Sequence, residues 1–420
     1  MLPARTLDVI ALFSSLVLLV AGNAMLGTIA ALRLEMEGFT AGVIGIVLAL
    51  TALGFVLGSL HGIRIVRRVG HIRAFATFGA VAAAVTLIHP LHVSVPLWMA
   101  LRLVLGFCIA GLMLVTESWV NGRATPETRG SLLATYMVLF YLAASGGQFL
   151  VALGDPALHH LFVVAGILIV LSLVPLAITR SAPPEMEASA RLGVGVLWRH
   201  SELGVVGASV SGVVLGAFGT VGPVFAYEMG LATEEVATFM GIAILSAMAV
   251  QWPMGYLSDY FPRRIVVLAV AGGAIAAALL TAAFGHRSML VLYAGVAVFY
   301  ALAACIYPLC LALTHDLLSK QQIVPASATL LLVNGIGSVG GPVIGGAAIS
   351  AIGPPGLLLF LALAIAALPL TALHAFRREA PPAVEEQSHC VGVAPVSTPA
   401  LVELDPRQDD GGAEPSARSA

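Results

Sequence analysis

The stretch RLVLGFCIAGLMLVTESWVNGRATPETRGSLLATYMVLFY, residues 102–141, contains two ionised side chains within apolar sequence. Arg102 and Glu117 are fifteen residues apart, which in an α-helix is a rise of about 22 Å and an angular offset of about 60°, so they share a face. Gly106, Ala110 and Met113 fill the same stripe, so another helix can approach it closely. A charge at bilayer depth costs roughly 2.5–3.5 kcal/mol, and residues that carry one usually turn inward and mark a transport path.

The composition of the whole chain indicates a membrane protein. Of its 420 residues 59% are hydrophobic and only 10% are charged, and the mean hydropathy is +0.99. Soluble domains carry about 25% charged residues, so this chain cannot cover a water-facing surface of ordinary charge density. Lys320 is the one lysine among the twenty basic residues, so arginine determines the membrane topology.

The four cysteines do not form a framework. Cys108, Cys305 and Cys310 lie in apolar segments, Cys390 lies in a polar segment near the C-terminus, and no C-x-x-C spacing occurs. A disulfide scaffold and a metal site are therefore not expected. No cofactor is expected either, since the phosphate-binding pattern G-x-x-x-x-G-K-[ST] is absent.

The first part of the chain predicts six membrane spans. A helix needs roughly 20 apolar residues to cross about 30 Å of hydrocarbon, and windows of that length follow one another. We expect spans at residues 9–32, 38–63, 74–91, 96–120, 130–154 and 156–179. Together they form an N-terminal six-helix bundle, residues 1–179, and a polar stretch with mixed charge, residues 180–202, follows as a linker.

The second part predicts six more spans, which form a C-terminal bundle over residues 203–377. Four of them are expected at residues 203–227, 236–258, 265–286 and 288–315. A long uncharged run, residues 321–376, is divided by Gly353-Pro354-Pro355-Gly356 into the last two. Residues 378–420 are acidic and proline-rich, too polar to bury a core, and we expect a disordered tail.

The basic residues predict the orientation of the spans. If both termini face the cytoplasm, the outside loops carry only Arg33 and Arg287, and Arg102 lies within a span. A bias of this size predicts that both termini lie inside. The membrane expected for such a protein is the bacterial inner membrane. The inside loops then carry Arg5, Arg64, Arg67, Arg68, Arg73, Arg123, Arg129, Arg180, Arg191, Arg199, Arg263, Arg264, Lys320, Arg377 and Arg378.

The two sets of six spans have matching loops. Gly58-Ser-Leu-His-Gly62 at the end of the second span precedes Arg67-Arg68, and Gly255-Tyr-Leu-Ser-Asp259 at the end of the eighth precedes Arg263-Arg264. Duplicated halves predict a pseudo-twofold axis and a cavity between the halves near the bilayer midplane. The fold class expected is all-α, a polytopic membrane protein with twelve transmembrane helices in two pseudo-symmetric six-helix bundles.

These motifs resemble the major facilitator superfamily of secondary transporters over residues 1–378. The family pattern G-x-x-x-D-R-x-G-R-R is well matched by Gly255, Asp259 and Arg263-Arg264, whereas in the first half Gly62 stands where the acid belongs. Arg102-Leu-Val-Leu-Gly106 matches the span-4 arginine motif, which the resemblance links to proton coupling.

A second group of motifs narrows the resemblance to one branch. Glu117-Ser-Trp-Val-Asn121, with Arg129-Gly130 and Tyr136-Met137 downstream, looks like the YcaD-like branch. Gly341-Pro342-Val-Ile-Gly345-Gly346 resembles a pattern that drug antiporters carry in span 5, but here it lies in span 11. The resemblance therefore implies the major facilitator fold and leaves import and export open.

Two ionic residues of the spans have alternative roles. Arg102 either lines the cavity and couples transport or extends to the outer headgroups. Glu117 is either a proton carrier or a latch that pairs with loop arginines when the transporter faces outward; a bias of a few kcal/mol suffices for such a latch. The residues expected at this cytoplasmic gate are Glu117, Arg64, Arg67, Arg68, Arg129, Asp259, Arg263, Arg264 and Asp316.

Polar residues near mid-span are candidates for substrate contact or for coupling. For each of them the alternative is an interhelical hydrogen bond that serves packing, worth about 0.6 kcal/mol. The candidates are Arg102, Asn23, Gln148, Tyr136, Tyr141, Gln251, Tyr307 and Asn334.

The sequence thus predicts a secondary active transporter that moves a small solute by alternating access, driven by protons. A cavity with few charges fits a neutral or amphipathic solute. The partners expected are this solute, protons and the lipid bilayer, in a monomer that binds no nucleic acid. The alternatives are a membrane sensor or scaffold, and an intramembrane enzyme, which would need a nucleophile with a base or an H-E-x-x-H helix, neither of which occurs.

Overall fold

The computed structural model describes residues 4–178, 192–375 and 398–402. Every regular element in these ranges is a helix. Twelve helices in the described ranges are long and apolar enough to cross a membrane. The predicted number of spans is therefore confirmed, and their order along the chain is the one expected.

The first six spans agree with the predicted windows to within a few residues at most ends. The sixth span is interrupted at Ser172, since Pro175 cannot donate the helical hydrogen bond to the carbonyl of Leu171. The helices are α1 (Ala4–Met36), α2 (Ala41–Val69), α3 (His71–Ile88) with η1 (His89–Leu91), α4 (Val95–Asn121), α5 (Arg129–Phe149) with η2 (Leu150–Leu153), α6 (His160–Leu171) and α7 (Leu173–Ile178).

The second six spans also follow the prediction, including the division of the last apolar run. Gly353 ends α13 with φ of 79°, a left-handed conformation that glycine adopts without strain. The elements are α8 (Val194–His200), α9 (Glu202–Glu228), α10 (Thr233–Tyr260), α11 (Arg263–Phe284), η3 (Gly285–Arg287), α12 (Met289–His315), η4 (Lys320–Gln322), α13 (Ile323–Ile352), α14 (Pro355–Ile365), α15 (Ala367–Ala375) and α16 (Pro399–Val402).

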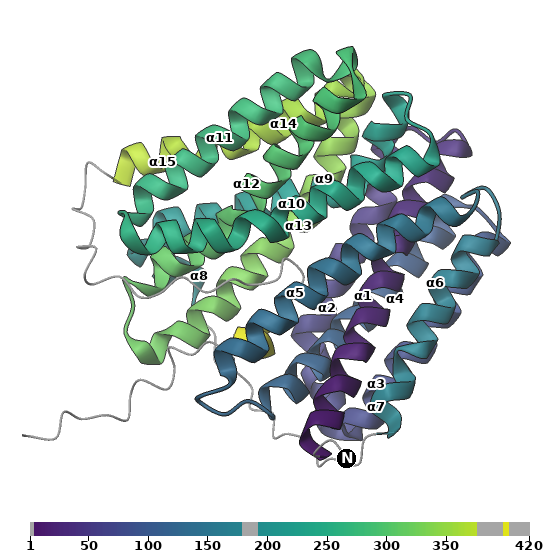
Figure 1. Cartoon of the computed structure of the whole chain (residues 1–420), viewed down its shortest axis with the longest axis horizontal. Coiled ribbons are helices and arrows are strands. Elements are labelled where there is room, and N and C mark those ends of the chain that lie inside the picture. Colours follow the sequence, from purple (N-terminus) through teal and green to yellow (C-terminus); the bar gives the residue numbers. More distant parts are fainter. Residues whose placement is uncertain (1–3, 179–191, 376–397, 403–420) are drawn as a thin grey trace, which may run out of the picture.

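The helices form two bundles with the same internal packing. In the first bundle α2 packs on α4 and α1 on α5, and in the second α10 packs on α12 and α9 on α13. Between the bundles α2 meets α13 and α5 meets α10, which is the pair of contacts that a pseudo-twofold axis exchanges. Figure 1 shows the two bundles side by side, the first in purple and blue and the second mostly in green.

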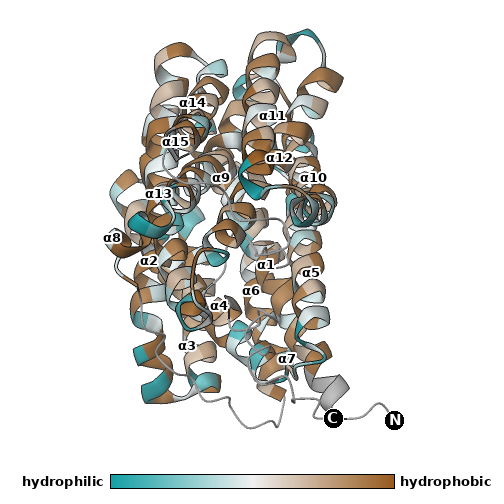
Figure 2. Cartoon of the chain, turned by 90° about the vertical axis from the view of Figure 1, so that its left-hand side faces the viewer, coloured by the Kyte–Doolittle hydropathy of each residue, from teal (hydrophilic) through white to brown (hydrophobic). Residues whose placement is uncertain are grey.

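The outer faces of the spans are apolar. Leu290, Leu363 and Leu370 are each at least 69% exposed, and many other large hydrophobic side chains face outward. Figure 2 shows hydrophobic residues along the length of the helices and hydrophilic residues mainly near their ends. A surface of this kind is suited to lipid rather than to water.

Most basic residues of the described ranges lie at one end of the bundles. We call this end, which carries the α2–α3, α4–α5 and α10–α11 connections, the arginine-rich end, and the other the opposite end. Arg64, Arg67 and Arg68 lie in the last two turns of α2, Arg129 begins α5, and Arg263 begins α11.

Two predicted segments outside the bundles differ from expectation where the structure describes them. In the linker, residues 179–191 lie outside the described ranges, and residues 194–200 form the short helix α8. In the tail, which we predicted to be disordered over residues 378–420, Thr398 and α16 pack against α4 and α13. The physical reason is Leu401, which is buried here, because burial of its apolar side chain lowers the free energy of the packed segment although most of the tail is polar.

Close helix contacts depend on single glycines. A Cβ at Gly147 of α5 would lie 2.3 Å from the carbonyl oxygen of Ala21 in α1, whereas a Cβ at its neighbour Gly146 would meet no atom within 4 Å. The α1–α5 packing therefore requires glycine at one of these two positions only.

We predict that Gly147→Ala lowers the thermal unfolding midpoint of the purified protein by several degrees, because the overpacked contact costs about 1–3 kcal/mol. The matched control Gly146→Ala should keep the midpoint or raise it slightly. Fluorescence-detected size-exclusion chromatography after heating would measure both. Equal midpoints for the two variants would contradict the close α1–α5 contact.

Candidate functional site

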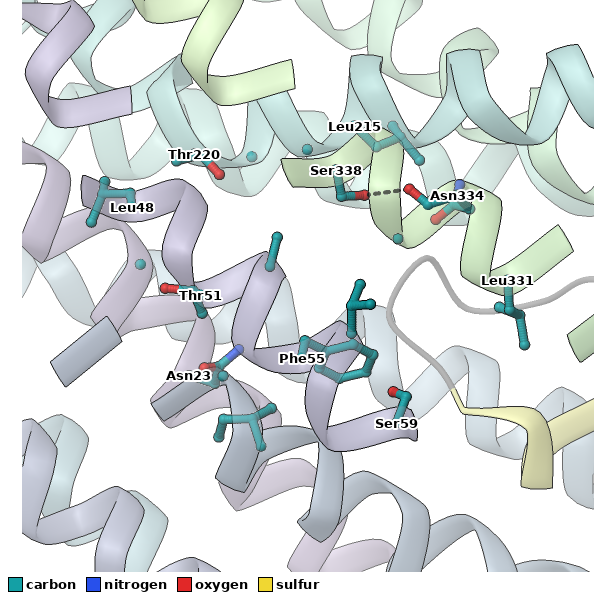
Figure 3. Close-up of a pocket in the computed structure, with 18 of the residues that line it drawn as sticks. Asn23, Leu48, Thr51, Phe55, Ser59, Leu215, Thr220, Leu331, Asn334 and Ser338 are labelled. Carbon is teal, nitrogen blue, oxygen red and sulfur yellow. Dashed lines mark hydrogen bonds between the residues drawn. The ribbon is translucent and has the colours of Figure 1, made fainter. Parts of the chain in front are cut away.

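A cavity of about 320 Å³ lies between the two bundles. Its wall comes from α1, α2 and α4 of the first bundle and from α9, α12 and α13 of the second. Figure 3 shows Asn23, Thr51 and Ser59 on one side, and Asn334 and Ser338 across from them. The predicted cavity between the halves is therefore present, and its size is in the range of small-molecule sites.

Several polar groups in this cavity lack a protein partner. Within the described ranges, the amide of Asn23 and the hydroxyl groups of Thr51 and Ser59 have no hydrogen-bond partner. Asn334 donates to the carbonyl of Ala208 at 3.2 Å and is 9% exposed. Polar groups inside a protein normally have partners, so the side chains of Asn23, Thr51 and Ser59 are available to a bound solute.

The lining of the cavity is uncharged. Its remaining polar residues are Thr220, Tyr300 and Ser338, and no Asp, Glu, Lys, Arg or His is among the residues that line it. A charged solute would meet no compensating charge there, and burying an unpaired charge is costly. The apolar side chains of the wall are Leu48, Phe55, Val56, Leu60, Ile109, Leu215, Leu331 and Leu332.

The bundles touch each other at the opposite end and close the cavity there. Gly42 N–H donates to Ser350 Oγ at 2.9 Å, where α2 begins and α13 ends. On the other side Ser145 Oγ donates to the carbonyl of Gly241 at 3.1 Å, near the end of α5 and the start of α10. The cavity continues toward the arginine-rich end as far as Leu60.

A second cavity, of about 380 Å³, lies between α5, α10 and α12. The predicted candidates Tyr141 and Gln251 both line it, and Gln251 Nε2 donates to Tyr141 Oη at 2.6 Å. This hydrogen bond joins the two bundles at a level closer to the arginine-rich end than the Ser145–Gly241 contact. Tyr141 and Gln251 thus hold the bundles together and are not lining residues of the central cavity.

The two ionic residues of α4 are both buried but have different surroundings. Arg102 is 2% exposed, donates to the carbonyl of Leu26 at 3.4 Å, and does not line the central cavity. Its alternative role, extension to the headgroups, does not fit this burial. Glu117 is 0% exposed and accepts a hydrogen bond from Tyr136 Oη at 2.8 Å. It also accepts two from Thr398 of the tail.

Of the remaining candidates for substrate contact, Asn23 and Asn334 line the central cavity, and Gln148, Tyr136 and Tyr307 do not. Gln148 accepts from Thr28 Oγ1 at 2.6 Å and donates to Ala24, so it joins α5 to α1. Tyr136 is bonded to Glu117, and the buried hydroxyl of Tyr307 has no partner. All three side chains are buried within the protein and lie outside the cavity wall.

The predicted gate residues separate into two groups. In the second bundle Arg263 contacts both Asp259 at 3.2 Å and Asp316, and it donates to the carbonyl of Ala312 at 3.2 Å. Arg264 is also buried, and Arg129 begins α5 at the same end. In the first bundle the gate arginines on α2 are exposed and form no ion pair with a described residue: Arg64, Arg67 and Arg68.

Among the described residues, Glu117 forms no hydrogen bond or ion pair with an arginine. The predicted latch concerns a state in which the arginine-rich end is closed, whereas here the bundles meet at the opposite end, so the latch stays a prediction.

Sequence reasoning missed the small hydroxyl residues of the cavity. Thr51 and Ser59 lie on α2 with Phe55 between them, at steps of four residues, so all three share a helix face. Asn334 and Ser338 have the same spacing on α13. This periodicity was readable in the sequence, but threonine and serine also occur in spans as packing residues, so the spacing alone could not select them.

Comparison with known proteins agrees with this architecture. The sequence profile described as Major Facilitator Superfamily matches residues 12–301 and 245–404. The "Uncharacterized MFS-type transporter YcaD" of Escherichia fergusonii is 30% identical over 343 residues, 80% of this chain and 87% of that protein.

Solved structures resemble the fold at low sequence identity. The nucleoside transporter NupG has a TM-score of 0.75 at 13% identity, covering 90% of this chain and 100% of that one. A bacterial homolog of the human lysosomal transporter Spinster has a TM-score of 0.69 at 14% identity, covering 92% of this chain and 99% of that one.

The twelve spans make the chain a multi-pass membrane protein, and its match to the family model and to the YcaD transporters makes it a membrane transporter. The chain belongs to the Major Facilitator Superfamily, and within it to the YcaD-like branch.

We predict that Arg263→Ala lowers the free energy of unfolding by roughly 3–5 kcal/mol, because it removes the guanidinium that contacts the buried carboxylate of Asp316. The double variant Arg263→Ala/Asp316→Ala should lose less than the sum of the two single variants. Thermal unfolding in detergent would measure the stability of the parent, the two single variants and the double variant. Arg68→Ala, at an exposed position, serves as control and should stay within about 0.5 kcal/mol; strictly additive losses would contradict the pairing.

Proposed function

We propose that the protein is a secondary active transporter that moves a small uncharged solute by alternating access. The observation that carries this proposal is the central cavity, which is lined by both bundles, contains unpartnered amide and hydroxyl groups, and has no charged residue in its wall. Apolar side chains make up most of the rest of the wall, so the solute has an apolar part beside its hydrogen-bonding groups. One chain completes the cavity, which supports a monomer as the working unit.

The arginine-rich end faces the cytoplasm in this proposal, and the membrane is the bacterial inner membrane. The excess of arginine in the connections of that end supports this orientation. Because the bundles touch at the opposite end, the structure then corresponds to a state closed to the outside. Alternation would separate α2 from α13 and α5 from α10 at the outer end and bring the bundles together at the inner end.

Proton coupling is proposed through α4. This helix carries Gly106 and Ile109 in the cavity wall, with buried Arg102 on one side of them and buried Glu117 on the other. Ionisable residues buried in a span are costly and usually serve ion or proton pathways. The match of Arg102 and Gly106 to the family's span-4 motif supports the same role.

Reconstituted protein tests the substrate class. We expect proteoliposomes to take up members of a panel of uncharged amides and polyols with an apolar part, and not the carboxylate or amine analogues. For a solute found in this way, Asn23→Asp should reduce uptake at least tenfold, because it introduces an unpaired charge into an uncharged cavity. Asn23→Ser keeps an uncharged hydrogen-bonding group and should stay within a few-fold of the parent. Uptake by Asn23→Asp equal to that of the parent would exclude Asn23 from the binding site.

Coupling is tested with the same solute under an imposed pH gradient. The gradient should increase uptake by the parent protein several-fold, and Arg102→Ala should remove this stimulation while solute exchange without a gradient continues. Arg68→Ala, on the exposed face of α2, is the control and should respond as the parent does. If uptake is indifferent both to the gradient and to Arg102→Ala, the coupling proposal is wrong.

A further inference from the structure

We propose that α4, α5 and α13 form a peptide-binding site at the arginine-rich end, whose ligand is the chain's own C-terminal segment. This segment consists of Thr398 and α16, and we call it the strap. The site is distinct from the solute cavity: Glu117, Tyr136 and Thr398 do not line it. The inference goes beyond the transport function and needs neither a known solute nor a known orientation.

The strap is bound through Glu117. Its Oε2 accepts the backbone N–H of Thr398 at 2.8 Å and also the Thr398 hydroxyl, while its Oε1 accepts the Tyr136 hydroxyl at 2.8 Å. Glu117 and Thr398 are both 0% exposed. A buried carboxyl group is costly unless hydrogen-bond partners surround it. Two of the three donors of Glu117 thus come from the strap.

The strap connects the two bundles. α16 packs against α4 of the first bundle and α13 of the second, and the side chains of Ala400 and Leu401 are 6% and 2% exposed. Residues 376–397 connect the strap to α15 along the chain, so binding is intramolecular and does not depend on the protein concentration. A few buried contacts therefore suffice to keep the strap bound.

The strap lies on the arginine-rich side of the solute cavity. Glu117 follows the cavity residue Ile109 by eight residues on α4, which is about 12 Å further along the helix. α16 packs on α4 and α13, two helices that also contribute to the cavity wall. In the view of Figure 3 the short yellow segment lies on the side of Ser59 and Leu331. The bound strap thus lies beyond the cavity on its arginine-rich side, between α4 and α13, and in this proposal it moves aside when a solute passes through that end.

The protection of a single cysteine in the cavity tests the strap. Ser59→Cys is placed in a chain whose Cys108, Cys305, Cys310 and Cys390 are replaced, and the protein is reconstituted in nanodiscs, which expose both ends. The rate of reaction with a bulky, membrane-impermeant maleimide is then measured. Ending the chain after residue 397 should raise this rate at least tenfold.

Single substitutions separate the strap's hydrogen bonds from its bulk. Thr398→Val removes the hydroxyl donor at nearly constant shape and should raise the labelling rate about tenfold, which corresponds to the loss of one buried hydrogen bond. Thr398→Ser keeps the donor and should stay within about twofold of the parent. Glu117→Ala should behave as Thr398→Val does or react faster still.

A photocrosslinking residue at position 400 provides a second readout that does not depend on labelling rates. Mass spectrometry should find its crosslinks on α4 or α13 in the parent, and Glu117→Ala should reduce them. Unchanged labelling after removal of the strap, or crosslinks from position 400 to other parts of the chain, would overturn the proposal. Because both measurements need no solute, a failure of the transport proposal leaves them interpretable.

Discussion

Every polar group inside a bilayer must find its partner within the protein, because lipid offers neither donors nor acceptors. The structure meets this constraint in different ways along α4 and its neighbours. Glu117 is surrounded by Tyr136 and by the tail residue Thr398, and Arg263 by two carboxylates and a backbone carbonyl. Arg102 has one backbone acceptor, the carbonyl of Leu26.

The central cavity is one place where this rule is relaxed. Asn23, Thr51 and Ser59 keep polar groups without protein partners, although each lies on a span. An uncharged group tolerates the lack of a partner better than a charged one, since an unpartnered amide or hydroxyl costs far less free energy than an unpaired charge. The uncharged wall thus limits both the cost of the empty cavity and the class of solute that fits it.

The two ends of the cavity have different kinds of contact between the bundles. At the opposite end, α2 and α13 lie so close that a Cβ at Gly45 would be 2.2 Å from the carbonyl oxygen of Pro342, so backbone packing alone closes the gap. At the arginine-rich end, α16 packs between α4 of the first bundle and α13 of the second. Closure by backbone packing has to be undone by moving whole bundles, whereas the strap can leave by breaking a few hydrogen bonds.

The sequence by itself determined the twelve spans, their division at Gly353, the family, and the presence of a cavity between two halves, because hydrophobic length and duplication are local properties of the chain. Only the tertiary structure decided which polar residues face that cavity. Asn23 and Gln148 are both mid-span amides of the first bundle, but Asn23 faces the cavity and Gln148 faces Thr28. The contact of Thr398 with Glu117 joins residues 281 positions apart, which no local pattern encodes.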